Sequence, residues 1–394
     1  MGRHFVMCWE LGADLGHVSQ MATIAAVLRD RGQRVSVVLA DVTQAPRYFG
    51  PLGVPWFQAP QPPAHHPGEI PLNHADLLWR SGYHDAVSLS GLLQAWRSLF
   101  DLLQPDLIIA EAAPTATLAA RCDGVRCVCL DNGFFVPPPG DPLPALRSWE
   151  PVPLDELQRR EARVQRVIDQ VLASQGRPGL GSFSRLFEVE THWLTWPELN
   201  HFGPHSPNLH LGAIQGLTSG QRLPWPDGMG RKVFAYLKPD HSHAIPVLEG
   251  CLRRGDRMLA YLPRWPAGEL RRLASLGAIH ISQAPLDMHA LLESGDLVVC
   301  HGGFGTVSQS LRAGKPLLLL PSHVEQVRTA QAAAALGVAV VPEEDRASRR
   351  LRIDGEALER ARIRAADHAL RLGSAEKSLG RLLDILLSAA GRAA

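Results

Sequence analysis

The feature that most constrains the fold is a repeated pattern in which a short apolar run is followed by a turn and then by a helical stretch. Between residues 296 and 341, an apolar run at 296–300 leads into the glycine-rich turn HGGFGT and a helical stretch at 307–313. A second apolar run at 316–320 precedes a second helix that begins near Glu325. Strands that alternate with helices in this way are typical of parallel sheets.

The same pattern occurs in both halves of the chain. Near-continuous apolar runs, as expected of strands buried on both faces, lie in the first half at 5–9, 35–39, 107–109 and 125–130. The runs of the second half are 232–237, 257–262, 278–281, 296–300, 316–320 and 338–341. We therefore predict an α/β protein with two Rossmann-like, doubly wound parallel-sheet domains that face each other across a cleft.

Composition indicates where the two domains separate. The stretch 196–227 is rich in Pro and Gly and has no periodicity, which is typical of a linker. We predict an N-terminal domain at 1–205, a linker at 206–227 and a C-terminal domain at 228–370. A helix at 371–394 is expected to pack back towards the N-terminal domain.

Three further segments have a distinctive composition. The Pro-rich stretch 51–71 predicts a surface loop without regular structure. A charged helix is expected at 155–173. A long helical tail is expected at 355–389, with Gly373 and Gly380 as its breaks.

Overall composition excludes several classes of protein. A length of 394 residues favours two domains, and 45% hydrophobic with 20% charged residues is ordinary for a globular protein. A net charge of +1 gives no electrostatic case for nucleic acid. No signal peptide is expected, and no apolar run is as long as a membrane span. Six scattered cysteines without a CxxC pair predict reduced thiols in a cytoplasmic protein.

The glycine-rich turn predicts an anion site. Gly302, Gly303 and Gly305 lie between a strand and a helix, so backbone N–H groups and the helix dipole point into the turn. His301 adds a side-chain donor, and a diphosphate is the expected occupant. Glu325 and Gln326 follow the next strand, close to the same edge, where they suit the hydroxyls of a sugar.

These motifs also carry a family resemblance that spans nearly the whole chain. In the second half they are Pro285-Leu286-Asp287, Leu291-Leu292, DLVV at 296–299, HGGFGT at 301–306, AGKPLLLLP at 313–321 and Glu325-Gln326. In the first half, Gly16-His17-Val18 precedes a helix. The chain resembles glycosyltransferases of the GT-B fold, in the UDP-glycosyltransferase superfamily that includes bacterial macrolide and antibiotic transferases and plant natural-product transferases.

The resemblance implies an inverting, metal-independent transfer of a sugar from a nucleoside diphosphate, UDP or dTDP, to a hydroxyl of a small apolar or lipid-like acceptor. His17 matches the family's general base, and a histidine titrates near neutrality. Glu111 stands where relatives carry the acid that orients the base, usually an aspartate. A helix-capping or exposed loop histidine is the alternative for His17. For Glu111 the alternative is a loop carboxylate paired with an arginine.

The donor site implied by the resemblance lies in the second half. Its residues are His301, Gly303, Phe304, Gly305, Thr306, Gln283, Ala284, Leu286, Glu325, Gln326 and Lys238. Two positions depart from the family. Plant relatives carry a tryptophan where Gln283 falls, and Gln309 stands at a glutamate that often meets the ribose, which allows a different nucleotide. Lys238 is either an extra cationic ligand for the diphosphate or a solvated lysine.

The acceptor site is less constrained. Asn132, Phe134 and Phe135 follow a strand and are expected to line it. Three other aromatic residues, Trp79, Tyr83 and Trp96, suit either this site or the core.

No metal site and no cofactor are expected. The chain has no Asp-x-Asp motif, and its loop histidines share no evident face; they are His201, His205, His210, His241 and His243.

Other functions remain open at this point. The chain also suits another GT-B enzyme, such as a lipid-intermediate N-acetylglucosaminyl transferase or a nucleotide-sugar epimerase. A non-catalytic nucleotide-sugar binding subunit is a third class, which His17 and His301 together argue against. The helix at 154–172 offers either a peripheral membrane contact or a solvated face. A monomer or a homodimer is expected.

Overall fold

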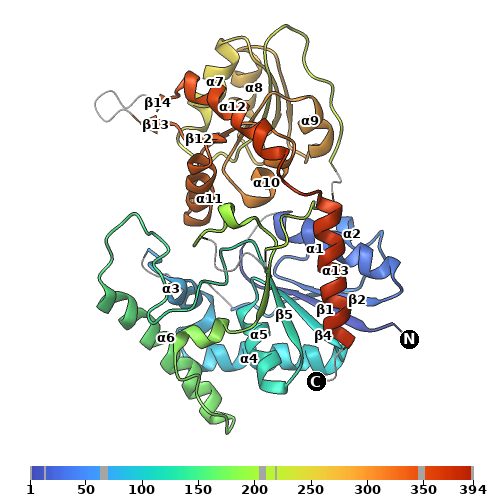
Figure 1. Ribbon diagram of the computed structural model, residues 1–394, viewed down its shortest axis with the longest axis vertical. Helices are drawn as coiled ribbons and strands as arrows, with labels where there is room; N and C mark the ends of the chain where they lie inside the picture. The colour runs from blue at the N-terminus through green and yellow to red at the C-terminus, as the bar shows by residue number, and fades with distance from the viewer. Residues whose placement is uncertain are drawn as a thin grey trace. The chain divides into compact units, whose positions relative to one another are not determined.

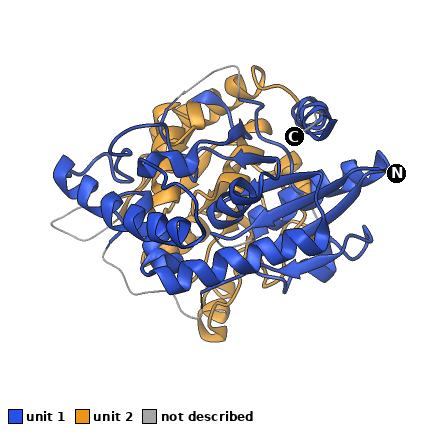
Figure 2. Cartoon of the chain, turned by 90° about the horizontal axis from the view of Figure 1, so that it is seen from below, with its two compact units in different colours: residues 1–197, 202–216, 375–394 blue, residues 198–201, 217–374 orange. Residues whose placement is uncertain are grey.

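The computed structural model describes residues 2–12, 15–62, 70–203, 210–217, 220–344 and 351–391. The chain divides into two compact units, which we describe separately (Figure 2). Unit 1 comprises Met1–Pro197, Phe202–Gly216 and Ala375–Ala394, and unit 2 comprises Glu198–His201 and Leu217–Ser374. The chain therefore leaves unit 1, forms most of unit 2, and returns to unit 1 at Ala375.

Unit 1 contains a six-stranded sheet with the order β3-β2-β1-β4-β5-β6, in which every pairing is parallel. Its strands are β1 (His4–Trp9), β2 (Arg34–Leu39), β3 (Trp56–Gln58), β4 (Leu107–Glu111), β5 (Cys127–Asp131) and β6 (Glu190–Trp193). The strand order reverses between β1 and β4, and ligands of such sheets bind beyond the carboxyl ends of the strands at that point. The last residues of β1 and β4 are therefore the place to look for a site.

Helices cover both faces of this sheet (Figure 1). The longer ones are α1 (Leu15–Asp30), α4 (Ala86–Leu103), α5 (Pro114–Asp123), α6 (Leu154–Ser174) and α13 (Ala375–Gly391). Shorter turns are α2 (Ala45–Tyr48), α3 (His74–Leu78), the π-helical η1 (Trp79–Tyr83), and the 3-10 turns η2 (Phe183–Phe187) and η3 (Pro197–Leu199). Strand β1 shows the two faces: Phe5 and Met7 pack with α1 and α13, whereas Val6 and Cys8 pack with α4, α5 and α6.

Unit 2 has a second parallel sheet, with the order β12-β11-β10-β7-β8-β9. Its strands are β7 (Lys232–Tyr236), β8 (Arg257–Tyr261), β9 (Ile279–Ser282), β10 (Leu297–Cys300), β11 (Leu317–Leu319) and β12 (Ala339–Val340). Its helices are α7 (Ala244–Arg253), α8 (Ala267–Ala274), α9 (Met288–Ser294), α10 (Phe304–Arg312), α11 (Val324–Ala335) and α12 (Gly355–Ala369). A small antiparallel pair, β13 (Glu343–Glu344) and β14 (Leu351–Arg352), lies outside the sheet.

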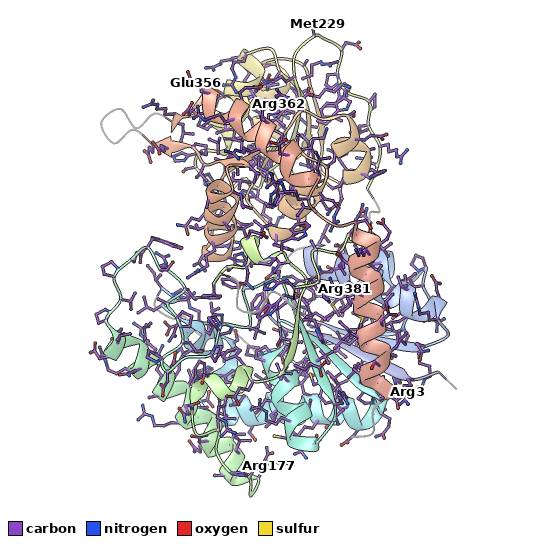
Figure 3. All side chains as sticks on the ribbon, viewed as in Figure 1. Arg3, Arg177, Met229, Glu356, Arg362 and Arg381 are labelled. Atoms are coloured by element: carbon purple, nitrogen blue, oxygen red, sulfur yellow. The ribbon has the colours of Figure 1, made fainter. Side chains whose placement is uncertain are left out.

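Helix α12 illustrates how the helices of unit 2 are amphipathic. Leu358, Ala361 and Ala365 recur every three or four residues and are buried. Glu356 and Arg362 lie on the exposed side (Figure 3). The helix is therefore held by one apolar stripe rather than by its ion pairs, because exposed pairs contribute little.

The predicted fold class is confirmed: each unit is a Rossmann-like domain with a parallel six-stranded sheet. The prediction that 51–71 lacks regular structure is wrong in part, because β3 (Trp56–Gln58) pairs with β2 through Val37, Val38 and Leu39. This strand is at the edge of the sheet, and its three residues are half-buried or exposed, so no apolar run marks it. Residues 63–69 lie outside the described part of the chain.

The C-terminal tail also differs from expectation. It forms two helices, α12 and α13, with the break at residues 370–374. Gly373 lies in this break as predicted, whereas Gly380 lies inside α13. A glycine costs a helix about 1 kcal/mol. Burial of the apolar face of α13 in the core beside α1 outweighs that cost.

Candidate catalytic dyad, acceptor pocket and donor loop

In unit 1 the structure brings His17 and Glu111 into direct contact. Nδ1 of His17 lies 2.7 Å from Oε1 and 2.8 Å from Oε2 of Glu111. Glu111 is the last residue of β4 and His17 lies in the first turn of α1, which follows β1. Because β1 and β4 are adjacent and parallel, with Trp9 opposite Glu111, both side chains reach the same edge of the sheet.

The contact fixes the state of the imidazole. A carboxylate accepts hydrogen bonds, so in the neutral ring the proton lies on Nδ1 and Nε2 is the nitrogen without a proton. The side chains of His17 and Glu111 are only 12% and 11% exposed, which limits their exchange with water. A histidine and a carboxyl group in this arrangement match what a general base held in one tautomer requires.

Aromatic rings and a glycine surround the imidazole of His17. The ring of Trp9 stacks on it, with centroids 5.0 Å apart and planes inclined by 19°. The ring of Phe135 lies at 6.2 Å. On the Nε2 side stands Gly12, whose φ of +92° suits glycine, and a Cβ at Gly12 would lie 2.6 Å from Nε2. A residue with a side chain would therefore obstruct this nitrogen.

Two buried carboxyl groups, which the sequence did not identify, support the dyad. Glu10 accepts hydrogen bonds from the backbone N–H groups of Thr115 (2.8 Å) and Ala116 (3.1 Å) at the start of α5. Burial raises the pKa of Glu10 to about 8, and these hydrogen bonds oppose the shift. Glu10 thereby ties the end of β1, which precedes His17, to the helix that follows Glu111.

Asp131, the last residue of β5, shapes the loop beside the base. Its carboxyl group accepts hydrogen bonds from the N–H groups of Gly133, Phe134 and Val136. Burial raises the pKa of Asp131 to about 7, and the nearby charge of Glu111 adds to the rise. The Asp-Asn-Gly sequence after a strand was a usable signal for such a turn, but its burial was not visible in the sequence.

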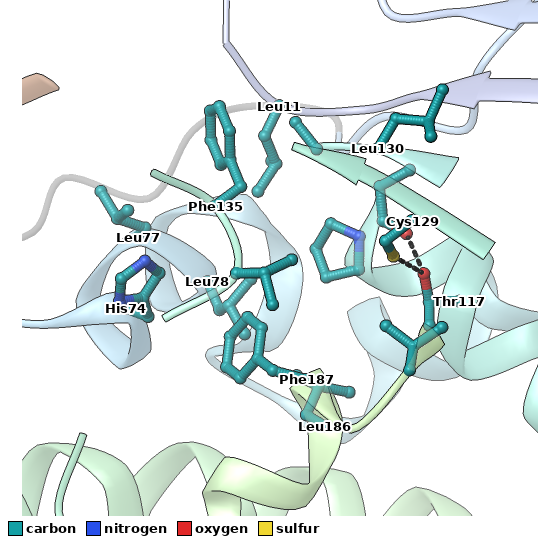
Figure 4. Close-up of a pocket in the computed structure, with 15 residues that line it drawn as sticks. Leu11, His74, Leu77, Leu78, Thr117, Cys129, Leu130, Phe135, Leu186 and Phe187 are labelled. Atoms are coloured by element: carbon teal, nitrogen blue, oxygen red, sulfur yellow. Dashed lines mark hydrogen bonds between the residues drawn. The ribbon is translucent and has the colours of Figure 1, made fainter. Parts of the chain in front are cut away.

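An apolar pocket adjoins the dyad. It encloses about 510 Å³, including the part open to solvent, and Figure 4 shows its lining. Leu11 and Ala112, next to Glu10 and Glu111, form its wall towards the dyad, together with Phe135. The remaining lining residues are His74, Leu77, Leu78, Ala113, Pro114, Thr117, Cys129, Leu130, Val136, Leu186, Phe187 and Val189.

Polar side-chain groups in this pocket are few. The hydroxyl of Thr117 donates to the carbonyl of Ala113 at 3.0 Å, and Nε2 of His74 lies 2.8 Å from the carbonyl of Phe134. A ligand that enters the pocket therefore gains mainly from apolar contact.

The residues expected around the acceptor fall into different environments. Phe135 lines the pocket, whereas the buried ring of Phe134 packs on His74 at 6.0 Å and Asn132 is half-buried in the same loop. Tyr83 and Trp96 are core residues with 0% exposure. Trp79 stacks under the guanidinium of Arg163 at 4.1 Å.

In unit 2 the glycine-rich turn joins β10 to α10. Gly302 has a φ of +88°, and a Cβ there would lie 3.2 Å from the carbonyl oxygen of Gln326, so this position favours glycine. Added Cβ atoms at Gly303 or Gly305 would meet nothing within 4 Å. Gly303 precedes the first turn of α10, where helices leave backbone N–H groups without an intrahelical partner, whereas the N–H of Thr306 donates to the carbonyl of Gly303 at 3.1 Å.

His301 lies behind this turn rather than in front of it. Its ring is 5% exposed; Nε2 accepts the backbone N–H of Lys238 at 2.6 Å, and Nδ1 lies 3.0 Å from the carbonyl oxygen of Leu320. The ring thus joins the segments that follow β7, β10 and β11. Both ring nitrogens of His301 therefore contact backbone atoms.

The other residues expected at the donor site lie on segments that follow the strands of this sheet. Glu325 is half-buried in the first turn of α11, and the side-chain oxygen of Gln326 accepts the N–H of Ser322 at 2.9 Å. Gln283 and Ala284 are exposed after β9, and Leu286 is buried. Lys238 follows β7.

Within the described residues, no group of three or more His, Cys, Asp or Glu side chains is arranged to hold a metal ion. His205 lies outside these residues. A search of the same part of the chain finds no helix of sufficient length and apolarity to cross a membrane. All six cysteines are free thiols.

Comparison with known proteins agrees with this architecture. Residues 270–372 match the model of the glycosyltransferase family 28 C-terminal domain. No curated protein sequence matches the chain.

Several solved structures cover nearly the whole chain. The glycosyltransferase of kitacinnamycin has 20% identity over 98% of this chain and 99% of that one, with a TM-score of 0.69. The calicheamicin glycosyltransferase CalG4 has 19% identity over 100% and 99%, with a TM-score of 0.67. The glycosyltransferase VinC, solved in complex with dTDP, has 17% identity over 99% and 100%, with a TM-score of 0.62. The chain thus has the GT-B fold of two Rossmann-like domains, and its residues 270–372 match the glycosyltransferase family 28 C-terminal domain.

Proposed function

We propose that the protein is an inverting, metal-independent glycosyltransferase that moves a sugar from a nucleoside diphosphate to a hydroxyl of an apolar small molecule. The observation that carries the proposal is the contact between His17 and Glu111 beside an apolar pocket. A bare nucleotide-binding subunit has no need of an oriented base.

In the proposed reaction, the acceptor hydroxyl gives its proton to Nε2 of His17 while its oxygen attacks the anomeric carbon. The bond from that carbon to the diphosphate oxygen breaks on the opposite face, so a single displacement inverts the configuration. Glu111 stabilises the imidazolium that forms, as the acid does in other acid-oriented histidine bases. The leaving diphosphate takes the electron pair.

The donor is proposed to bind on unit 2. The start of α10 would hold the diphosphate through the backbone N–H groups of Gly303, Phe304 and Gly305 and the hydroxyl of Thr306, and stabilise its growing charge. Lys238 is proposed to add a cation, since its own N–H contacts His301 behind that turn. Glu325 and Gln326 are proposed to bind the sugar, and the turn that contains Gln283, Ala284 and Leu286 to bind the base. VinC was solved with dTDP, which favours dTDP or UDP here.

The acceptor is proposed to place an apolar body in the pocket of unit 1 and its hydroxyl at His17. Among the lining side chains, only Thr117 and His74 carry nitrogen or oxygen atoms. The hydroxyl of Thr117 and Nε2 of His74 each contact a backbone carbonyl. A nucleotide-sugar epimerase would need no such pocket, because it has no acceptor. The pocket therefore favours transfer over epimerisation.

Replacement of the base tests this function. His17→Ala should lower turnover by roughly two to four orders of magnitude, the usual contribution of a general base. Its affinity for dTDP or UDP, measured by calorimetry, should remain, because those ligands are proposed to bind unit 2. His289→Ala, at an exposed position of α9, is the control. Turnover close to that of the control would contradict the assignment.

A further inference from the structure

Two imidazoles join the same pair of loops in unit 2. His301 accepts the N–H of Lys238 on Nε2 (2.6 Å) and contacts the carbonyl of Leu320 through Nδ1 (3.0 Å). His241 accepts the N–H of His243 on Nδ1 (3.1 Å), and its ring hydrogen-bonds to the carbonyl of Pro321. The two rings lie 6.2 Å apart.

Each ring therefore links the segment 238–243, after β7, to residues 320–321, after β11. We refer to these two rings and their four backbone contacts as the histidine clamp. The clamp lies at the start of the glycine-rich turn, because His301 directly precedes Gly302. It sets the position of Lys238 relative to that turn.

The clamp requires neutral imidazoles. A neutral ring accepts on one nitrogen and donates on the other, as both rings do here, whereas a protonated ring has an N–H on each nitrogen. Protonation of His241 would set its Nδ1–H against the N–H of His243 and break that contact. Burial lowers the pKa of His241, and the nearby His301 and His243 lower it further.

Charged and titratable groups face His241 from each neighbouring segment. On its own loop are Asp240, which raises the pKa of His241, and His243, whose ring lies 5.4 Å away. His301 faces it from the turn after β10. Behind His243 stands Glu344 of β13, with 3.7 Å between His243 Nε2 and the carboxylate.

We propose that His241 is a positioning residue of the donor site, which holds the 238–243 loop in the conformation that binds the diphosphate and releases it when protonated. The inference rests on the proposed donor site on unit 2. The proposal predicts the opposite pH dependence of diphosphate affinity from that of a direct charge contact. A protonated histidine that touched the diphosphate directly would strengthen binding at low pH, whereas protonation of the clamp weakens it.

Binding of dTDP and UDP by calorimetry at pH 7.5 and 5.5 tests the proposal. At pH 7.5, His241→Phe should bind both diphosphates about three- to tenfold more weakly than wild type, the effect of about one lost hydrogen bond. Affinity for thymidine or uridine, which lack phosphates, should not change. At pH 5.5 the wild-type affinity divided by the His241→Phe affinity should fall towards one. Protonation of the phosphate affects both proteins equally, so it does not change this ratio.

Two further variants separate positioning from general damage. His241→Asn keeps an acceptor for the N–H of His243 and does not titrate. It should therefore bind the diphosphates more tightly than His241→Phe at pH 7.5. The ratio of the affinities of these two variants should not depend on pH. His280→Gln is the matched control, because its ring also contacts a proline carbonyl, that of Pro224, but on β9. It should bind as wild type does.

An NMR titration of the protein without ligand tests the clamp independently of the donor. The ring signals of His241 and the amide signal of His243 should shift together, with a midpoint below the ordinary pKa of a histidine. If they titrate separately, the clamp is wrong. It is also wrong if His241→Phe weakens nucleoside and diphosphate equally, or if wild type gains affinity at pH 5.5 relative to His241→Phe. If the NMR titration is as expected but the protein binds neither diphosphate, the proposed donor site is wrong. The clamp is then only a structural contact, and the proposed role of His241 is rejected as well.

Discussion

Gly12 determines what can stand beside the imidazole of His17. It combines a φ of +92° with a position where an added Cβ would lie 2.6 Å from Nε2, the nitrogen that is proposed to take the proton. Gly12→Ala should therefore lower kcat by about a hundredfold, the cost of misplacing a reacting group by about an ångström. It should also lower the free energy of unfolding by about 1–2 kcal/mol, because a side chain disfavours positive φ.

Gly124 provides a control that separates these two effects. Its φ is +67°, but a Cβ there would meet nothing within 4 Å. Gly124→Ala should match the loss of stability, measured by urea unfolding, and leave kcat unchanged. Equal kcat in the two variants would show that Nε2 does not need the space at Gly12.

The family resemblance placed Glu111 where relatives carry the acid that orients the base, and left a loop carboxylate paired with an arginine as the alternative; the structure brings Glu111 into contact with His17. The longer side chain of Glu111 still reaches His17 with both oxygens. Glu10 and Asp131 were missed because a carboxylate near a strand end carries no sign of its burial. The orientation of His301 could not be foreseen either, since its partners at Lys238 and Leu320 are backbone atoms distant in sequence.

Helix α6 is tied to the rest of unit 1 by a buried carboxyl group. Oε1 of Glu161 accepts hydrogen bonds from the side chain of Asn73 (2.9 Å) and the N–H of Leu143 (2.8 Å). Asn73 caps α3, whose residues line the apolar pocket. Burial raises the pKa of Glu161 to about 7, and the charge of Asp141 adds to it.

This shift predicts how stability depends on pH. The unfolded chain releases the proton of Glu161 near pH 4, whereas the folded chain keeps it until about pH 7. The folded state thus binds more protons in between, and the free energy of unfolding falls as pH rises through this window. Glu161→Gln, which keeps the acceptor but cannot titrate, should reduce the fall between pH 5 and 8 by on the order of 2 kcal/mol.

Urea unfolding at several pH values measures this effect. Glu356→Gln, at an exposed position of α12, should leave the pH dependence as in wild type. An unchanged slope in Glu161→Gln would mean that Glu161 is ionised in the folded protein at pH 5.

In unit 1, strands were predictable where they are central and not where they lie at an edge, whereas the edge strands β9 and β12 of unit 2 were both found. The buried runs of β1, β2, β4 and β5 are nearly continuous in apolar residues and were all found. The edge strands β3 and β6 were not. The sequence of β6 is Glu-Thr-His-Trp, which contains no continuous apolar run. This strand lies at the edge of the sheet and pairs only with β5. Pairing, not composition, makes these segments strands.

At the scale of the whole molecule, the proposed reaction assigns its charge stabilisation to the protein rather than to a divalent ion. The start of α10 supplies oriented N–H groups for the diphosphate. Turnover should therefore be unchanged after exhaustive treatment with EDTA and gel filtration. A kinetic assay of the metal-depleted enzyme, with metal content measured by mass spectrometry, checks this. Loss of turnover that Mg²⁺ or Mn²⁺ restores would contradict the proposal.

The return of the chain to unit 1 at Ala375 has a consequence for biosynthesis. Leu382, Leu383 and Leu386 of α13 belong to the core between the first sheet and α1, yet they are translated after all of unit 2. Because the ribosome releases the chain from its N-terminus onwards, the first 200 residues emerge without the helix that completes their core. Unit 2 is complete before unit 1, so the part of the protein that begins first on the ribosome is the part that finishes folding last.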